Sequence, residues 1–445
     1  MARYFGTNGV RGLFSELGPK LAMELSQAIG AYFGCGRILV ARDGRLTGEC
    51  LKHAVIAGLQ SAGCEAVDLE YASAPTAEFM IKKLKAEGLI IITASHNPPE
   101  WNALKVVDGN GVTISRERGE EIERLLGHVE RAHWDKVRPA IRHGTATAEH
   151  IDAIAGLVDA TRIKERKPRL VLDCGNGMAA IIAPAMLERL GCGIMTLNGK
   201  VDGRFPGRPS EPTEANVQKL LGAVRGSGAD AGIAWDGDGD RVIFADELGG
   251  YVIGDRVFAL SVLWKLSKKK GNIATTVSTS RAAEDIAKGF GCKTIYTKIG
   301  APYLSEEIAK GRVVIAGEEV GGVIWPELSL AKDGLMTAAK LAEALCEKPL
   351  GAWLKDIPQY FNMKAKIPAE SGEDKRKIVE RVRKEMKARK LRMTEIDGAR
   401  ADSDDSWVIC RPSGTENYVR VFAEARSGAK AKALLEEWKK IAEKR

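Results

Sequence analysis

Three aspartates alternate with glycines in the stretch "AWDGDGDRVIF" (234–244), at Asp236, Asp238 and Asp240. Negative charges held this closely repel one another unless a cation compensates them, and carboxylate oxygens favour a hard divalent cation such as Mg²⁺. The nearest rival pattern is an EF-hand calcium loop. That loop needs glycine at its sixth position, where this chain has Arg241, and the flanking residues look like strands. We therefore predict a Mg²⁺ site with coordination positions left open for a phosphate oxygen, against the alternative of an acidic solvated turn.

A serine follows an apolar run in "TASHNPPEWNALK" (93–105). Ser95 is expected just past the carboxyl end of a buried strand over 88–92, where open α/β sheets place their ligands. Pro98 and Pro99 prevent the loop from continuing the strand ladder. A serine hydrolase would need a Gly-x-Ser-x-Gly elbow, which does not surround this serine. Two interpretations stay open, namely a Ser/Asn-rich turn and a phosphate carrier that completes the Mg²⁺ ligands.

Two neighbours of Ser95 also offer chemistry. Lys105 lies near enough in the same loop to act as a cationic partner, or as a proton carrier if its pKa is lowered. His96 is adjacent to Ser95 in sequence, so we expect its ring to point away from the serine.

Two further loops carry polar side chains that could bind a ligand. "CRPSGTENYVR" (410–420) offers a guanidinium, hydroxyls and a flexible backbone between two strands, which makes a phosphate cradle, or else a hairpin with capping hydroxyls. "AGEEVGGVIW" (316–325) places Glu318 and Glu319 in a glycine-bounded loop suited to sugar hydroxyls.

A repeated unit must position these loops. The pairs Gly63-Cys64, Gly191-Cys192 and Gly291-Cys292 each end a helix and begin a strand, and each unit is preceded by a strand and a turn. The glycine suits the left-handed position after a helix, and the cysteine is then a small buried apolar residue. Three occurrences of the order strand–loop–helix–strand predict three related α/β domains with largely parallel sheets. A smaller α+β domain follows, with helices over 371–390 and 428–444 and strands over 406–410 and 418–425.

Composition narrows the class of protein. The chain has 445 residues, 28% of them charged, and a formal net charge of +8. It has no apolar run of membrane-spanning length and no secretory h-region, so we expect neither a transmembrane helix nor a secretory signal. Eight scattered cysteines argue against a zinc site or a disulfide framework and fit a reducing cytoplasm. The basic runs at 162–169, 265–270 and 381–392 are expected to be solvated faces or linkers. Without an aromatic RNA-binding signature, a positive field can equally steer small anions.

Together and in this order, the motifs resemble the α-D-phosphohexomutase family. The residues that carry the resemblance are "TASHNPP" (93–99), "DGDGDR" (236–241), "GEEVGG" (317–322) and "RPSGTE" (411–416), and "FGTNGVRG" (5–12) adds a fifth match. The resemblance spans the entire chain. Its first motif and "TKIG" (297–300) are most similar to phosphoglucosamine mutases and their archaeal relatives.

The resemblance implies an enzyme that gives a phosphate from Ser95 to a hexose 6-phosphate or 1-phosphate, holds the 1,6-bisphosphate, and takes the other phosphate back. One Mg²⁺ would be held by the Ser95 phosphate with Asp236, Asp238 and Asp240, and hexose 1,6-bisphosphate would be the activator. The catalytic candidates are Ser95, Lys105 as proton donor or acceptor, Arg11, and His96 beside the carrier. The candidate substrate contacts are Arg241, Lys298, Glu318, Arg411, Ser413, Gly414 and Thr415.

The implied fold is three three-layer α/β domains with mixed, largely parallel sheets and a smaller, mobile α+β domain around a central cleft. We predict the domains at 1–148, 149–250, 251–364 and 365–445. The predicted protein is a cytoplasmic phosphosugar mutase, with glucosamine phosphate as the best candidate and no nucleic-acid or membrane partner. A homodimer is compatible with it. The alternatives are a broad phosphoglucomutase/phosphomannomutase and a non-catalytic sugar-phosphate-binding protein, which would not need the carrier serine.

Four departures from the family pattern bear on the sugar rather than on phosphate transfer. Val320 stands where Ser or Asn is common, and Gly322 stands where many relatives have His. Ala301-Pro302 replace a frequent acidic residue, and Asn417 replaces Pro.

Overall fold

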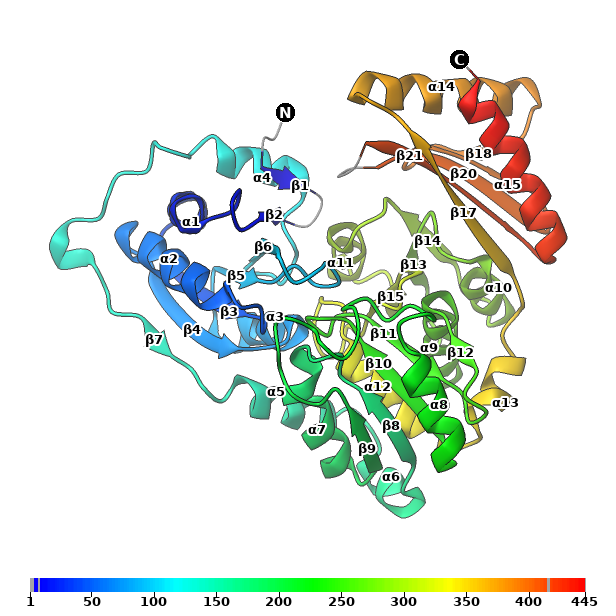
Figure 1. The fold of residues 1–445 in the computed structure, drawn as a ribbon, viewed down its shortest axis with the longest axis horizontal. Coiled ribbons are helices and arrows are strands. Elements are labelled where there is room, and N and C mark those ends of the chain that lie inside the picture. The colour runs from blue at the N-terminus through cyan, green and yellow to red at the C-terminus, as the bar shows by residue number, and fades with distance from the viewer. Residues whose placement is uncertain (1–3, 7–8, 414–416, 445) are drawn as a thin grey trace.

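The computed structural model describes residues 4–6, 9–413 and 417–444. Within these residues the chain forms four successive sheets with their helices (Figure 1). In Figure 1 the first sheet lies at the left, the second at the bottom, the third at the right and the fourth at the top. We call the four units domains I to IV. The predicted fold class, three α/β domains and a smaller α+β domain, is confirmed.

Domain I is a three-layer unit. Its sheet has the order β1-β2-β6-β5-β3-β4-β7 and is mixed, with β5, β3, β4 and β7 parallel. The strands are β1 (Phe5–Gly6), β2 (Gly9–Leu13), β3 (Arg37–Arg42), β4 (Glu65–Tyr71), β5 (Gly88–Ile92), β6 (Trp101–Asp108) and β7 (Ile141–Arg142); the helices are α1 (Pro19–Tyr32), α2 (Gly48–Ser61), α3 (Ala74–Leu84) and α4 (Arg116–Glu123). Alternate residues of β5 enter two hydrophobic clusters, one under α1 and α2 and one under α3. An apolar run without polar alternation is what a strand buried on both faces requires.

Domains II and III share one hydrophobic core. Their sheets have the orders β12-β11-β10-β8-β9 and β14-β13-β15-β16. The elements of domain II are α5 (Ala146–Ala155), α6 (Ala160–Arg166), β8 (Arg169–Asp173), α7 (Ala183–Leu190), β9 (Gly193–Leu197), α8 (Gln218–Ser227), β10 (Ala231–Trp235), β11 (Val242–Ala245) and β12 (Tyr251–Val252). Those of domain III are α9 (Gly254–Lys268), β13 (Ile273–Thr276), α10 (Arg281–Gly289), β14 (Thr294–Thr297), α11 (Ala301–Ala309), β15 (Ile315–Gly317), β16 (Val323–Ile324), α12 (Gly334–Ala344) and α13 (Leu350–Lys355). A single cluster contains Ile154, Trp235 and Leu335, so the two domains pack as one block.

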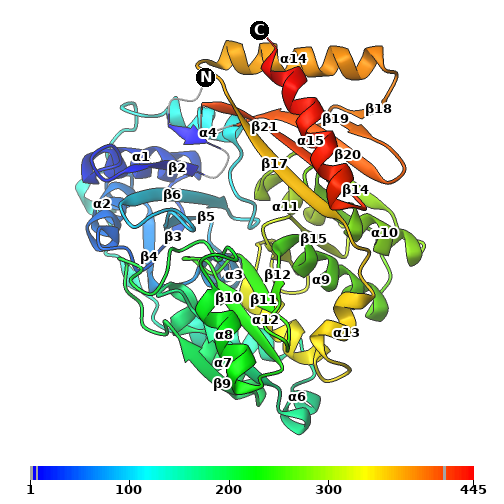
Figure 2. The ribbon, with the colours of Figure 1, turned by 45° about the vertical axis from the view of Figure 1, so that its right-hand side comes forward.

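Domain IV is an antiparallel sheet of order β17-β21-β20-β19-β18 with two helices. The elements are β17 (Phe361–Pro368), α14 (Gly372–Ala388), β18 (Arg392–Thr394), β19 (Ala399–Asp402), β20 (Ser406–Pro412), β21 (Tyr418–Ala425) and α15 (Gly428–Glu443). Figure 2 shows α14 and α15 on the outer side of this sheet. Trp407, Ile409 and Phe422 form a cluster with Val277 of domain III, so the opposite face is an interface between domains.

The repeated unit is confirmed in its backbone. Strands β3 and β4, β8 and β9, and β13 and β14 pair in parallel. Gly63, Gly191 and Gly291 have φ values of 85°, 98° and 73°, the left-handed region expected after a helix. Of the cysteines that follow them, the first two are buried, and Cys292 is only half-buried. The prediction of a buried thiol is therefore wrong for the third repeat.

The sheets depart by a few residues from the predicted ranges. Strand β12 at 251–252 pairs with β11, so it belongs to the second sheet rather than to the range 251–364. Strand β17 begins at Phe361, before the predicted start at 365, because it pairs along its length with β21. In the part of the chain that the structure describes, no helix combines the length and apolarity needed to cross a membrane.

Candidate active site

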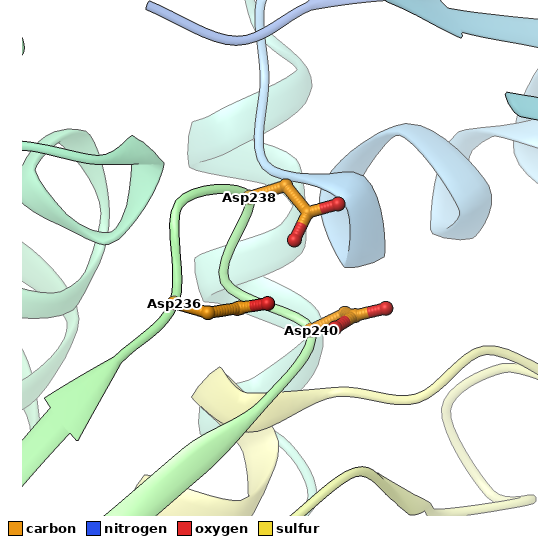
Figure 3. Close-up of side chains that lie close together, drawn as sticks. All are labelled: Asp236, Asp238 and Asp240. Atoms are coloured by element: carbon orange, nitrogen blue, oxygen red, sulfur yellow. The ribbon is translucent and has the colours of Figure 1, made fainter. Parts of the chain in front are cut away.

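The three aspartates lie on the turn of an antiparallel hairpin between β10 and β11, which we call the metal loop (residues 236–241). All three are buried, and one carboxylate oxygen from each lies within 4.8 Å of the others. Figure 3 shows the side chains on the same side of the loop. The Oδ1 atoms of Asp238 and Asp240 are buried and have no hydrogen-bond partner among the described residues. Unpartnered carboxylate oxygens converging in a buried site fit a hard divalent cation such as Mg²⁺.

The surroundings divide the charge of the metal loop unevenly. Burial and the charge of Asp240 raise the pKa of both Asp236 and Asp238. Burial alone would also raise the pKa of Asp240, but Lys332, Lys105 and Arg241 outweigh it and lower that pKa below its usual range. The protein's own cations therefore neutralise one carboxylate, and the other two gain most from a bound cation.

Ser95 faces the metal loop from domain I. It lies in the serine loop (residues 93–100) that follows β5, and its Oγ donates a hydrogen bond of 2.7 Å to Asp236 Oδ2. The residue is buried, and its φ of 49° lies in the left-handed region, which is uncommon for a side chain other than glycine, Asn or Asp. Such strain persists only where the surroundings fix it, and it concentrates at functional sites.

A buried arginine that the sequence analysis missed holds the serine loop. Arg45 donates hydrogen bonds to the carbonyls of Ser95 (3.0 Å), Asn97 (2.7 Å) and Trp101 (3.0 Å), and also to that of Pro98. Its Nε donates to Asp43 Oδ2 at 3.1 Å. The only sequence signal was the "RDGR" turn after β3, which on its own is a common turn pattern.

The expectation that His96 points away from Ser95 is wrong. Its Nδ1 lies 3.5 Å from Ser95 Oγ, at the limit of a hydrogen bond. Because Ser95 adopts the left-handed conformation, consecutive side chains of this loop do not alternate in direction as they would on a strand. Arg241, burial and Arg11 lower the pKa of His96 to about 2, so its ring is neutral.

Lys105 lies on strand β6, not in the loop as expected, opposite Ile91 of β5. Its Nζ lies 2.5 Å from Glu78 Oε1 and 3.8 Å from Asp240 Oδ2. Burial alone would lower the pKa of Lys105, but Glu78, Asp240 and Asp238 together raise it above its usual range. The condition that we set for Lys105 as a proton carrier, a lowered pKa, is therefore not met. Lys105 is a protonated cation beside the metal loop.

A second lysine, Lys332, was also missed. Its Nζ lies 3.2 Å from Asp240 Oδ2 and 2.7 Å from Glu318 Oε1. A Cβ atom added to Gly322 would lie 2.4 Å from Lys332 Cδ, so the glycine leaves the room that this lysine fills. Glu318, predicted to contact sugar hydroxyls, is here the partner of Lys332.

Two arginines complete this group. Arg241 Nε lies 4.0 Å from Asp236 Oδ2 and 3.9 Å from Asp240 Oδ1, and those carboxylates raise its pKa against the effect of burial. Arg11 Nη1 donates a 3.4 Å hydrogen bond to Asn97 Oδ1. Burial and the charge of Arg241 lower the pKa of Arg11. These contacts join most of the predicted site residues into one group around the three aspartates. Its other members are Ser95, His96, Lys105, Arg11, Arg241 and Glu318.

The predicted phosphate cradle lies on domain IV. Arg411 Nε donates to Asp397 Oδ2 at 3.2 Å, and the same oxygen accepts the N–H of Ile299 from domain III. Ser413 is buried, and its N–H donates to the carbonyl of Tyr418 at 3.0 Å. Gly414 and Thr415 lie outside the described residues.

Lys298 directly precedes Ile299, whose N–H contacts Asp397 beside Arg411. It is exposed, and its Nζ lies 5.4 Å from the centre of the Tyr303 ring.

Four stretches of the chain match the four domains described as phosphoglucomutase/phosphomannomutase: alpha/beta/alpha domain I over residues 2–132, domain II over 148–249, domain III over 253–361 and the C-terminal domain over 367–441. Over 447 residues the chain is 37% identical to a phosphoglucomutase/phosphomannomutase of Thermococcus kodakarensis, covering 98% of this chain and 97% of the relative. It is 35% identical over 443 residues to a probable phosphoglucosamine mutase of Methanopyrus kandleri, covering 98% and 97%.

Among solved structures, a phosphoglucomutase/phosphomannomutase family protein of Burkholderia thailandensis has a TM-score of 0.88 and 24% identity. The similarity covers 98% of this chain and 96% of that one, which shows a common fold.

Proposed function

Because the chain belongs to the phosphoglucomutase/phosphomannomutase family of phosphohexomutases, we propose that it interconverts hexose 6-phosphate and hexose 1-phosphate through a phosphorylated Ser95 and a bound 1,6-bisphosphate. The observation that carries the proposal is the 2.7 Å hydrogen bond from Ser95 Oγ to Asp236 Oδ2. A strained, buried serine in contact with a cluster of three carboxylates suits a phosphate carrier, because the phosphate would share the cation of that cluster.

Each half of the proposed reaction exchanges one P–O bond for another. A sugar hydroxyl attacks the phosphorus on Ser95, the bond to Oγ breaks, a bond to the sugar oxygen forms, and the hydroxyl proton ends on Oγ. The second half runs the same exchange in reverse with the other phosphate of the bisphosphate. Such transfers need positioning and charge neutralisation more than covalent assistance.

Side chains around Ser95 meet those needs. Arg45 fixes the serine loop through its carbonyls, which holds Oγ in line for transfer. Lys105, held protonated by Glu78 and Asp240, supplies positive charge for the transferring phosphate. As the proton donor in one half of the reaction, it would be the acceptor in the other. The neutral His96 ring and Arg11 line the same loop.

Asp236, Asp238 and Asp240, together with an oxygen on Ser95, would hold Mg²⁺. The bound ion would neutralise the charge on the phosphoryl oxygens during transfer.

The remaining candidate residues would grip the parts of the sugar that do not react. Arg411, Ser413, Gly414 and Thr415 are proposed to bind the second phosphate, and Glu318, Arg241 and Lys298 to contact the sugar. A clamp remote from Ser95 lets binding energy at one phosphate favour transfer at the other.

Glucosamine phosphate is our proposed hexose, supported by the resemblance of the N-terminal motif and by the relative named as a probable phosphoglucosamine mutase. A broad phosphoglucomutase/phosphomannomutase activity is the second candidate, favoured by the relative of Thermococcus kodakarensis with that name. We also propose a cytoplasmic location, supported by eight cysteines that are all free thiols. The homodimer stays a prediction.

The test is a comparison of rates on glucosamine, glucose and mannose phosphates, each with its 1,6-bisphosphate as activator. Wild-type protein is expected to favour glucosamine phosphate and to take up labelled phosphate on Ser95. Ser95→Ala is expected to abolish isomerisation while sugar-phosphate binding persists, because the serine does not belong to the remote clamp. Turnover by the Ser95→Ala variant would contradict the carrier mechanism, and equal rates on the three sugars would favour the second candidate.

A further inference from the structure

A histidine outside the site described above lies between three domains. His150 of α5, in domain II, has no exposed surface. Its Nδ1 lies 2.9 Å from Thr76 Oγ1 of α3, in domain I, and its Nε2 lies 3.0 Å from Asp333 Oδ2, which precedes α12 in domain III. The ring also stacks on Phe79, with ring centres 5.1 Å apart.

The partners give this chain of hydrogen bonds one direction. Asp333 Oδ1 accepts the N–H groups of Leu335 and Met336, each at 2.8 Å, so the carboxylate caps α12 and accepts from His150 at Oδ2. In a neutral ring the Nε2 proton then points to Asp333, and Nδ1 accepts from the hydroxyl of Thr76. The hydroxyl of Ser73, 2.6 Å from Thr76 Oγ1, can donate to that oxygen. Every member of the buried chain is satisfied, which makes such networks rigid.

At each end of this chain of hydrogen bonds, the adjoining residue contacts the metal loop. On the domain I side, the residue after Ser73 is Ala74, whose N–H donates to the carbonyl of Asp238 at 2.9 Å. On the domain III side, the residue before Asp333 is Lys332, whose Nζ lies 3.2 Å from Asp240 Oδ2. These two aspartates are the members of the metal loop whose Oδ1 atoms have no hydrogen-bond partner among the described residues.

The residue after Asp333 adds a further contact on that side. The carbonyl of Gly334 accepts the indole N–H of Trp235 at 3.0 Å, directly before the metal loop. A Cβ atom added to Gly334 would lie 2.8 Å from the carbonyl oxygen of Gly239, so α12 begins in close contact with the loop.

We propose that His150 is a positioning residue of the metal site. By holding Thr76 and Asp333 at a fixed separation, it fixes the loop contacts of Ala74 and Lys332 and thereby the orientation of the carboxylates of Asp238 and Asp240. Its role is that of an outer-shell partner, which orients ligands without touching the metal. The inference rests on the proposed magnesium site.

The experiment measures metal binding directly on the full chain, with Mn²⁺ as the probe and its free concentration followed by electron paramagnetic resonance. Replacing His150 by Phe keeps the stacking on Phe79 and removes both hydrogen bonds. The Mn²⁺ dissociation constant is expected to rise about tenfold or more, as for other outer-shell changes. His150→Gln keeps a donor toward Asp333 and is expected to recover most of this loss. At saturating metal the KM for the phosphosugar should stay unchanged, because the hydrogen bonds of His150 do not involve Arg411 and Ser413, which are proposed to bind the second phosphate.

A matched control separates positioning from loss of packing. Ile154 is buried on the same helix, so Ile154→Ala should lower the melting temperature without changing the Mn²⁺ dissociation constant. If His150→Phe does not fold, Thr76→Val removes a single hydroxyl from the chain, and its dissociation constant is expected to rise in the same direction. The inference is overturned if the folded variant, His150→Phe or Thr76→Val, binds Mn²⁺ with the wild-type dissociation constant. It is also overturned if Ile154→Ala raises this dissociation constant by the same factor as that variant. A wild-type protein that binds no Mn²⁺ overturns the metal site itself.

Discussion

Gly237 lies at a contact between the metal loop and the serine loop, and adding one methyl group there tests their proximity. A Cβ atom on this residue would lie 2.6 Å from the carbonyl oxygen of Ser95 and 2.6 Å from Ser210 Oγ. Those two groups are themselves joined, because Ser210 Oγ donates a 2.9 Å hydrogen bond to that carbonyl. The same carbonyl also accepts from Arg45 at 3.0 Å, so it cannot turn aside without losing partners.

The expected size of the effect follows from that distance. Since ordinary contacts of a Cβ atom begin near 3.4 Å, Gly237→Ala must separate the two loops by about 0.8 Å, the difference from 2.6 Å. Overpacking of this kind destabilises a fold by about 1–3 kcal/mol. A displacement approaching 1 Å between reacting groups lowers a rate by about 100-fold. We therefore expect kcat to fall by about this factor in the mutase assay, while the protein stays folded.

A second glycine of the same domain provides the control. Gly222 lies within α8, and nothing lies within 4 Å of a Cβ added to it. Gly222→Ala should leave kcat unchanged and raise stability by up to about 1 kcal/mol, since alanine favours a helix over glycine. Wild-type kcat and melting temperature in Gly237→Ala would refute the reasoning, because the two loops could not then be this close in the working enzyme.

Three further outcomes are expected. Asp238→Asn should raise the Mg²⁺ concentration for half-maximal activity and lower activity with it, because one of three charged ligands is lost; an unchanged metal titration would count against the assignment. Arg45→Lys should lower kcat by about tenfold or more with little change in KM, since a lysine cannot hold four carbonyls in a fixed fork; unaltered steady-state kinetics would show that the serine loop needs no such support. With a thiol reagent on the native protein, exposed Cys50 should react first, whereas Cys64, Cys174, Cys192 and Cys410, whose pKa burial raises to about 12, should react only after unfolding; rapid modification of these four would contradict the core.

The placements that the sequence predicted correctly are those decided by the local sequence. The alternation of Asp236, Asp238 and Asp240 with glycine places three carboxylates on one turn whatever the rest of the chain does. Likewise, a serine after an apolar run marks the end of a strand, and Ser95 lies there. The repeated glycines at 63, 191 and 291 predicted the domain plan because a helix followed by a left-handed residue is also decided locally.

The residues that were missed act on partners far away in the sequence. Arg45 and Lys332 lie in loops and Glu78 lies in α3, and each is a single charged side chain without a pattern around it. Their importance lies in the partners that folding supplies, namely loop carbonyls, Lys105 and Asp240. The protonation of Lys105 was misjudged for the same reason, since its pKa depends on Glu78 and Asp240, which lie far away in the sequence.

The departure at Gly322 gains a physical explanation from Lys332. A side chain at position 322 would collide with the methylenes of this lysine, at 2.4 Å from its Cδ, so the two positions compete for one space. The lysine brings a charge that pairs with Glu318 at 2.7 Å, and it therefore changes the partner of the carboxylate proposed to contact the sugar. Positions 318, 322 and 332 are thus coupled, and the effects of substitutions there will not add. If Glu318 contacts the sugar as proposed, we expect sugar preference to depend on this three-residue contact as well as on the loop motif.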